Sequence, residues 1–365
     1  MRIQAFLTRP LLIILLLTWP LLYSGQAAEY PLTLKDSLGR ELTLNTPPKR
    51  VVCLLGSVTD LLVKLDKTDI LVGLTRQDLL NHSSLRLASL GSFSQPDNEA
   101  IEAAEPDLII ASLSNQALLK KWQTNPQIFS KALFFDEGSL EQGFARMELI
   151  GRLVERQQAA QAIIDQNREQ IALVRTRVQQ LPREKRKRVA RVVAGANGMY
   201  CPGDDSFQNE MIEAAGGVPP HWGINGSFVS VDLSTWKTFN PQIIYGCDRN
   251  MEAVRAQLQQ EGWKEVDAVR NHAITQLPCS IACQITVQVG AAVQWLAASF
   301  YPALFADTSK TVRKNGVDDE RPLTLDLSFV QSAKVVTHRV NDADFKSLAI
   351  RFTPPNRSSP PLTAT

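Results

Sequence analysis

Short apolar runs alternate with amphipathic stretches twice along this chain, and this rhythm constrains the fold more than any other feature. In the first half the apolar runs cover residues 51–55, 70–74 and 106–111. In the second half, runs at 189–194 and 242–245 alternate with helical stretches at 207–215 and 251–260. Strands that alternate with helices form parallel sheets covered by helices. The sequence therefore predicts an α/β fold with two lobes, each built on a mainly parallel sheet.

A long segment of helical periodicity separates the two halves. Apolar residues recur from Leu140 to Val154 and, after a polar interruption, from Ala160 to Leu181. A helix there ends before Pro182. At 1.5 Å per residue, roughly 25 residues span about 37 Å, the width of a small domain. We therefore expect one backbone helix to join the lobes, with a ligand cleft between them at the carboxyl ends of the strands.

The N-terminus has the pattern of an export signal. Arg2 and Arg9 precede the apolar run 11–23, and the small residues at 24–28 suit a signal-peptidase site. The run is shorter than the roughly 20 apolar residues of a membrane-spanning helix, although an uncleaved anchor is the alternative. We predict a signal peptide at 1–28 and a mature chain in an exported, oxidising compartment. The remaining divisions are an N-terminal lobe (29–138), helices that include the backbone helix (139–181), a C-terminal lobe (182–306) and a flexible extension (307–365).

The charge balance gives no reason to expect a nucleic-acid partner. The chain has 39 Lys and Arg residues and 37 Asp and Glu residues. Because residues 1–28 contribute only Arg2 and Arg9, removing them leaves 37 of each sign. A neutral chain lacks the positive excess that attracts phosphate backbones or anionic membranes.

The five cysteines are Cys53, Cys201, Cys247, Cys279 and Cys283, and an odd number leaves at least one unpaired. Cys53 lies in an apolar run and is interpreted as a small core residue. In an oxidising compartment Cys279 and Cys283 pair with each other, or one of the two pairs with Cys247. Zinc is the alternative, but it requires four ligands and no histidine lies within a few residues of this pair. We predict a disulfide among Cys247, Cys279 and Cys283, and no metal site.

Several short motifs, taken in order, resemble the periplasmic substrate-binding proteins of ABC importers for cobalamin, iron-siderophores and haem. They are LKDSLGR (34–40), PPKRVV (47–52), VGL (72–74), GSF (91–93), PDNE (96–99), EPDLI (105–109), GDDSF (203–207), EAAGG (213–217), NPQII (240–244) and YP (301–302). The resemblance covers residues 32–306. It implies two lobes on a helical backbone, capture of a ligand without chemistry, and delivery to an importer permease by a protein expected to be a monomer.

The same resemblance implies a docking surface. In this family one glutamate on the outer face of each lobe docks against arginines of the permease, and Glu99 matches the first position. Its alternative interpretation is an acid in the first turn of a helix, where the helix dipole favours negative charge. The second position falls on Ser234, which departs from the family pattern, and Asp232 is the acid nearby.

A bulky amphipathic ligand requires aromatic and apolar walls with a few hydrogen-bonding groups. Loops after the predicted strands supply the candidates, with a core position as the alternative for each aromatic residue. Tyr200 and Trp222 are the strongest because they lie in loops rich in Gly and Pro. The full set of predicted ligand-binding residues is Ser57, Arg76, Phe93, Ser114, Tyr200, Phe207, Trp222 and Phe228.

Two further resemblances favour a corrinoid, cobalamin or cobinamide, as the ligand. The cysteine-bearing segments 239–247 and 277–283 look like a subgroup found beside cobalamin-type importers. Residues 345–357 are similar to the opening of adenosylcobinamide amidohydrolase domains, although only a stub is present. A ferric siderophore or haem in the same role is the alternative.

Enzyme signatures are missing from the sequence. It has no G-x-S-x-G elbow, no H-E-x-x-H and no G-x-G-x-x-G after a predicted strand. The four histidines, His82, His221, His272 and His338, are scattered. We therefore predict no catalytic residues and no cofactor. A cysteine-dependent metalloenzyme or hydrolase is the alternative of another class, and a free metal ion or an oxyanion such as molybdate is an alternative cargo.

Overall fold

The computed structural model describes residues 30–195 and 198–305. The predicted signal peptide and the predicted extension with its amidohydrolase-like stub lie outside the described residues. Within them the chain has the expected α/β fold, with two lobes and a long helix between them in the sequence. None of the helices in these described ranges combines the length and the apolar character that a bilayer crossing requires.

Lobe one (residues 30–138) contains a five-stranded parallel sheet with the strand order β5-β4-β3-β6-β7. A short antiparallel hairpin, β1-β2, precedes it. The strands are β1 (Leu32–Lys35), β2 (Glu41–Leu44), β3 (Val51–Cys53), β4 (Leu71–Leu74), β5 (Ala88–Ser89), β6 (Leu108–Ser112) and β7 (Ala132–Phe135). The helices are α1 (Gly56–Lys64), α2 (Arg76–Asn81), α3 (Asn98–Ala103), α4 (Gln116–Gln123) and α5 (Pro126–Phe129), with a 3-10 turn at Thr68–Ile70.

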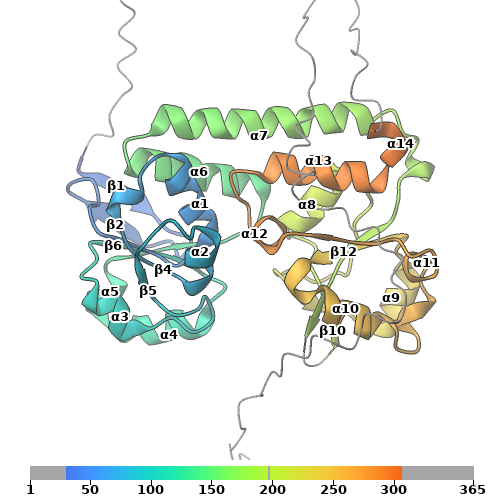
Figure 1. The fold of residues 1–365 in the computed structure, drawn as a ribbon, viewed down its shortest axis with the longest axis horizontal. Helices are drawn as coiled ribbons and strands as arrows, with labels where there is room; N and C mark the ends of the chain where they lie inside the picture. The colour runs from blue at the N-terminus through green and yellow to red at the C-terminus, as the bar shows by residue number, and fades with distance from the viewer. Residues whose placement is uncertain (1–29, 196–197, 306–365) are drawn as a thin grey trace, which may run out of the picture. The chain divides into compact units, whose positions relative to one another are not determined.

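Two helices follow lobe one, as the interrupted periodicity predicts. Helix α6 (Leu140–Leu153) begins with a capping box in which Ser139 and Gln142 satisfy each other's backbone N–H groups. Helix α7 (Gln157–Val178) has 22 residues and is therefore about 33 Å long. It packs against α6 and α13 (Figure 1). The buried Asn167 fixes this packing, because its amide donates to the Val287 carbonyl and accepts from the Gly290 N–H.

Lobe two (residues 182–305) contains a three-stranded parallel sheet, β13-β12-β8, and a three-stranded antiparallel sheet, β11-β10-β9. Its strands are β8 (Val189–Arg191), β9 (Val193–Gly195), β10 (Gly198–Cys201), β11 (Val229–Ser230), β12 (Ile243–Cys247) and β13 (Ile274–Leu277). Its helices are α8 (Phe207–Ala214), α9 (Leu233–Phe239), α10 (Met251–Leu258), α11 (Asp267–Arg270), α12 (Cys279–Ala282), α13 (Val289–Phe300) and α14 (Pro302–Phe305), with 3-10 turns at Arg183–Lys185, Asp248–Asn250 and Trp263–Glu265.

The apolar run 189–194 was expected to be one strand, and this prediction is wrong. Residues 189–191 pair in parallel with β12, whereas 193–195 pair antiparallel with β10. The chain changes sheet at Val192, whose N–H still donates to the Tyr245 carbonyl. The apolar run indicates that residues 189–191 and 193–195 are both strand-forming or buried. It carries no information about which strand each of them pairs with.

The end of α8 follows the expected glycine signal. Gly216 has a φ of +83°, the left-handed conformation that closes a helix at little cost for glycine. A Cβ atom at this position would lie 2.7 Å from the Val178 side chain. Close packing between the end of α8 and the end of α7 therefore also requires a glycine.

Candidate functional site

Three predicted ligand-binding residues of lobe one lie along one edge of its sheet. Arg76 follows β4, Phe93 follows β5 and Ser114 follows β6, and all three are exposed. Because these strands are parallel, their carboxyl ends meet at the same edge. The Arg76 N–H donates to the Gly91 carbonyl at 2.7 Å, and the Asn115 amide donates to the Phe93 carbonyl. These bonds hold neighbouring loops together, so the edge is a preformed surface.

Ser57, the fourth candidate in lobe one, is buried at a contact between the lobes. Its backbone N–H donates to Gln284 Oε1 at 2.5 Å, and its hydroxyl donates to Glu137 at 3.4 Å. Only 3% of Ser57 is exposed, so it has no free ligand face in this structure. Gln284 was not anticipated, because nothing in a single glutamine signals a contact 227 positions away.

A buried ion pair continues this contact. Arg146 lies 3.5 Å from Glu137 and donates to the Asp136 and Ile285 carbonyls. Burial raises the pKa of Glu137 and lowers that of Arg146, whereas each charge opposes the effect of burial on its partner. Gly143 of α6 allows the Ile285 side chain to pack directly against the helix backbone. A Cβ atom at position 143 would lie 2.4 Å from Ile285 Cγ2.

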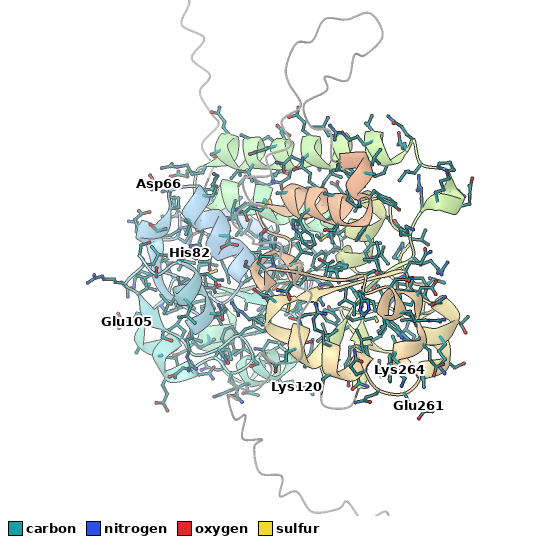
Figure 2. All side chains as sticks on the ribbon, turned by 45° about the vertical axis from the view of Figure 1, so that its right-hand side comes forward. Asp66, His82, Glu105, Lys120, Glu261 and Lys264 are labelled. Atoms are coloured by element: carbon teal, nitrogen blue, oxygen red, sulfur yellow. The ribbon has the colours of Figure 1, made fainter. Side chains whose placement is uncertain are left out.

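Asp78 is a buried acid beside this edge, in the first turn of helix α2 after β4. It is 5% exposed and accepts a hydrogen bond from the Thr75 hydroxyl at 2.7 Å. Burial raises its pKa from 3.8 to about 6, although the Thr75 hydrogen bond opposes the shift. Burial also raises the pKa of the nearby Asp60, which pairs with His82, labelled in Figure 2.

We expect Asp78→Asn to remove a pH dependence of stability. A raised folded pKa means that the neutral acid contributes stability below the unfolded pKa, and that this contribution is lost as pH rises through about 6. Between about pH 4 and pH 7, the unfolding free energy of wild type should fall by about 2–3 kcal/mol relative to Asp78→Asn. Urea unfolding at both pH values measures this difference. Glu169→Gln, which changes an exposed carboxylate of α7, is the control. If the unfolding free energy falls equally between the two pH values in Asp78→Asn and in Glu169→Gln, Asp78 is not the source of the pH dependence.

In lobe two, Tyr200 and Phe228 lie near the carboxyl end of β8. Tyr200 pairs with Ser230 across β10 and β11 and packs its ring against Gly195. Phe228 is 40% exposed, and its ring centroid lies 5.7 Å from the Arg191 guanidinium carbon. Both aromatic residues are at least partly accessible. Their contact with a ligand stays a prediction.

Phe207 and Trp222 lie elsewhere. Phe207 is 4% exposed in the first turn of α8, so it is a core residue here, as its alternative interpretation anticipated. Trp222 packs edge-on against Phe239 at a centroid distance of 5.6 Å, and Phe239 ends α9 shortly before β12 begins. Aromatic residues in Gly- and Pro-rich loops still fold onto the nearest apolar surface, because burial of a ring is strongly favourable.

The three cysteines that were predicted to form a disulfide are close together. Cys247 ends β12, whereas Cys279 and Cys283 bracket α12. The Cys279 sulfur lies 3.0 Å from the Cys247 sulfur and 3.4 Å from the Cys283 sulfur. All five cysteines are free thiols in the structure, and the disulfide stays a prediction. The pKa of Cys247 is lowered because Cys279 and Cys283 donate hydrogen bonds to it, and the pKa of Cys279 is raised because it donates.

Arg191 adjoins the cysteines and was missed by the sequence analysis. It is 0% exposed in the apolar strand β8, and its Nη2 lies 3.5 Å from the Cys283 sulfur. An arginine within an apolar run is the one available signal, because Arg is almost never fully buried without a partner.

Glu99 and Ser234, the two positions that the family pattern assigns to docking, occupy equivalent places in the two lobes. Glu99 is the second residue of α3, nine residues before β6, and Ser234 is the second residue of α9, nine residues before β12. Asp97 and Asp232 cap these helices by accepting hydrogen bonds from Ala100 and Thr235. The Thr235 hydrogen bonds lower the pKa of Asp232. Asp232 thus corresponds to the cap Asp97 rather than to Glu99.

An open depression also lies on lobe two, apart from the predicted ligand-binding residues. Its lining includes Lys237, Asn240 and Lys264, the last of which is labelled in Figure 2. Glu265 and Arg270 complete the lining. Long, charged and solvated side chains do not form the apolar wall that a bulky amphipathic ligand requires.

Comparison with known proteins identifies the family. Residues 51–280 match the periplasmic binding protein family. An uncharacterised ABC transporter substrate-binding lipoprotein of Bacillus subtilis, YvrC, is 22% identical over 287 residues, which cover 76% of this chain and 88% of YvrC. A cobalamin-binding protein of Halobacterium salinarum is 27% identical over 198 residues, which cover 53% of this chain and 52% of that protein.

A solved structure supports the fold. The molybdate-binding protein MolA of Haemophilus influenzae, bound to molybdate, superposes with a TM-score of 0.64 at 19% sequence identity, covering 76% of this chain and 94% of MolA. The matches are to substrate-binding proteins rather than to enzymes, and they imply an extracytoplasmic location. With a match across residues 51–280, this chain belongs to the periplasmic binding protein family, whose members serve ABC importers.

Proposed function

We propose that this protein captures a corrinoid, cobalamin or cobinamide, in the periplasm and delivers it to an ABC importer permease. The observation that carries the ligand class is the similarity to the cobalamin-binding protein of Halobacterium salinarum, at 27% identity over about half of each chain. Transport of an intact ligand is consistent with a family of substrate-binding proteins that have no catalytic role.

The chemistry of the strand ends supports a large, weakly charged ligand. Phe93 and Phe228 are exposed, and Ser114 is an exposed residue that carries a hydroxyl group. Arg76 is the one cation among the predicted ligand-binding residues. A tetrahedral oxyanion would instead require several convergent donors, so molybdate, the ligand of MolA, is the less suitable cargo.

Ligand titration tests this proposal directly. The chain without residues 1–28 is titrated with cyanocobalamin, dicyanocobinamide, haem, a ferric hydroxamate and molybdate while tryptophan fluorescence is followed. We expect saturable quenching by the two corrinoids, and at least 10-fold weaker binding after Phe228→Ala. Leu38→Ala, an exposed apolar residue in the β1-β2 hairpin, is the control. Saturation by haem, the hydroxamate or molybdate alone would refute the corrinoid assignment.

We expect Glu99→Gln to lower ligand uptake at least 10-fold while leaving the ligand dissociation constant unchanged. The exposed carboxylate at the start of α3 would contact the permease, and removing its charge would weaken docking alone. Uptake into vesicles that contain the permease is the measurement, with Glu169→Gln as the matched control. Asp232→Asn retains an N-cap residue and removes only the charge, so it tests the second contact without loss of the helix cap. Wild-type uptake in both variants would exclude these acids as docking residues.

A further inference from the structure

Three thiols converge where β12 and β13 end. Cys247 is the last residue of β12, and Cys279 and Cys283 lie on one turn of chain just after β13. Their three sulfur atoms all lie within 4.8 Å of one another. The Asp248 carboxylate accepts the Cys279 N–H at 3.0 Å, which fixes the start of α12 against the end of β12.

A buried cation lies beside these thiols. The Arg191 guanidinium is fully buried, donates to the Val192 carbonyl, and approaches the Cys283 sulfur at 3.5 Å. Throughout residues 30–195 and 198–305, no carboxylate lies within ion-pair distance of Arg191, and its Nε has no hydrogen-bond partner. Burial of an uncompensated charge is costly, so the site requires a negative partner.

We propose that Cys247, Cys279 and Cys283 bind one divalent thiophilic cation of the Zn²⁺ class through three thiolates. Binding converts three thiols and M²⁺ into M(SR)₃⁻ and releases three protons. The complex carries one negative charge, which the Arg191 guanidinium neutralises. With a monovalent cation such as Cu⁺, the three thiolates would give a complex of charge −2. Together with the Arg191 guanidinium, the site would then keep a net charge of −1.

The positions of the sulfur atoms suit this coordination. With Zn–S bonds of about 2.3 Å, tetrahedral geometry separates the sulfur atoms by about 3.8 Å. The Cys279–Cys247 and Cys279–Cys283 sulfur distances, 3.0 and 3.4 Å, would open by about 0.8 and 0.4 Å on binding. Cys279 and Cys283 are half-buried, so a fourth position is accessible to water.

This site does not depend on the proposed function, because it needs no organic ligand. It also makes a different prediction from the disulfide that the sequence suggested. A disulfide between two of these cysteines leaves three free thiols among five, whereas a metal thiolate site keeps all five reduced. The two states therefore differ in metal content and in thiol count.

The test uses the full mature chain, reduced and freed of metal with a chelator. We expect it to bind one Zn²⁺ per chain and release up to three protons, and to show a sulfur-to-metal charge-transfer band with Cd²⁺. In air the zinc-loaded chain should retain five thiols after denaturation. Absence of zinc binding, or a count of three thiols in the zinc-treated chain, would overturn the proposal.

Matched variants locate the metal. Cys279→Ser and Cys247→Ser should weaken Zn²⁺ binding at least 100-fold and abolish the Cd²⁺ band, whereas Cys201→Ala, a buried thiol outside the cluster, should change neither. Arg191→Met removes the positive charge and should weaken Zn²⁺ binding by about 10–100-fold. Arg191→Lys keeps the charge and should bind Zn²⁺ as the wild type does, so it tests the site even if Arg191→Met does not fold. Zinc binding that persists in Cys279→Ser would exclude the thiolate site. Titration of Cys279→Ser with corrinoids separates the metal site from the proposed function. Corrinoid binding should persist in this variant even though Zn²⁺ binding is lost.

Discussion

Replacing Arg146 with methionine is expected to destabilise the chain by about 3–5 kcal/mol at neutral pH. Arg146 is 4% exposed, and its guanidinium neutralises Glu137 and donates to two backbone carbonyls. The substitution leaves the Glu137 carboxylate without its cation in a buried setting. Breaking one half of a buried pair costs far more than the net contribution of the intact pair.

The pH dependence gives this prediction its signature. Burial already raises the pKa of Glu137, and loss of Arg146 raises it further. A raised folded pKa removes stability as pH increases, so Arg146→Met should be more destabilising at about pH 8 than at about pH 5. Urea unfolding of both proteins at the two pH values measures the effect.

The double variant Glu137→Gln/Arg146→Met is the control for lost packing. It removes both charges, so most of the stability should return, and the dependence on pH should vanish. If the double variant is as unstable as Arg146→Met at both pH values, the loss comes from packing of the arginine side chain and not from the charge on Glu137.

Trp122→Ala is expected to destabilise lobe one by about 3–5 kcal/mol. Trp122 is 1% exposed, packs against Phe134 at a centroid distance of 6.0 Å, and donates from Nε1 to Asn98 at 2.6 Å. The substitution leaves a cavity in the core on one face of the sheet and an unpaired amide oxygen. The denaturation midpoint, followed by circular dichroism, reports the loss.

Trp222→Ala provides the matched comparison. Trp222 is only half-buried, and its Nε1 has no hydrogen-bond partner within the described residues, so its removal should cost about half as much or less. If Trp222→Ala is as destabilising as Trp122→Ala, the loop at 221–226 contributes more to lobe two than its exposure indicates.

Much of the architecture was predictable from periodicity. The long helix α7, the glycine that ends α8 and the strands β3, β4, β6 and β12 all correspond to signals within single segments. Strand β13, whose sequence is Ile-Thr-Gln-Leu, was missed because it has no apolar run and is held by its parallel pairing with β12.

The site was less predictable than the fold. Arg76, Phe93 and Ser114 were placed together because they follow neighbouring parallel strands, which is a rule of topology. Phe207 is buried in the first turn of α8, and its role in ligand binding stays a prediction. Gln284 was missed because its partner, Ser57, lies in the other lobe.

The amino-acid sequence by itself determined the fold class, the two-lobed division and the family, because each depends on local periodicity or on the order of short motifs. Only the tertiary structure decided that Arg191 lies against Cys283, that Cys247 meets Cys279, and that Ser57 is covered by Gln284. These contacts join residues 32 to 227 positions apart. Their formation depends on strand order and on burial, which no local pattern records.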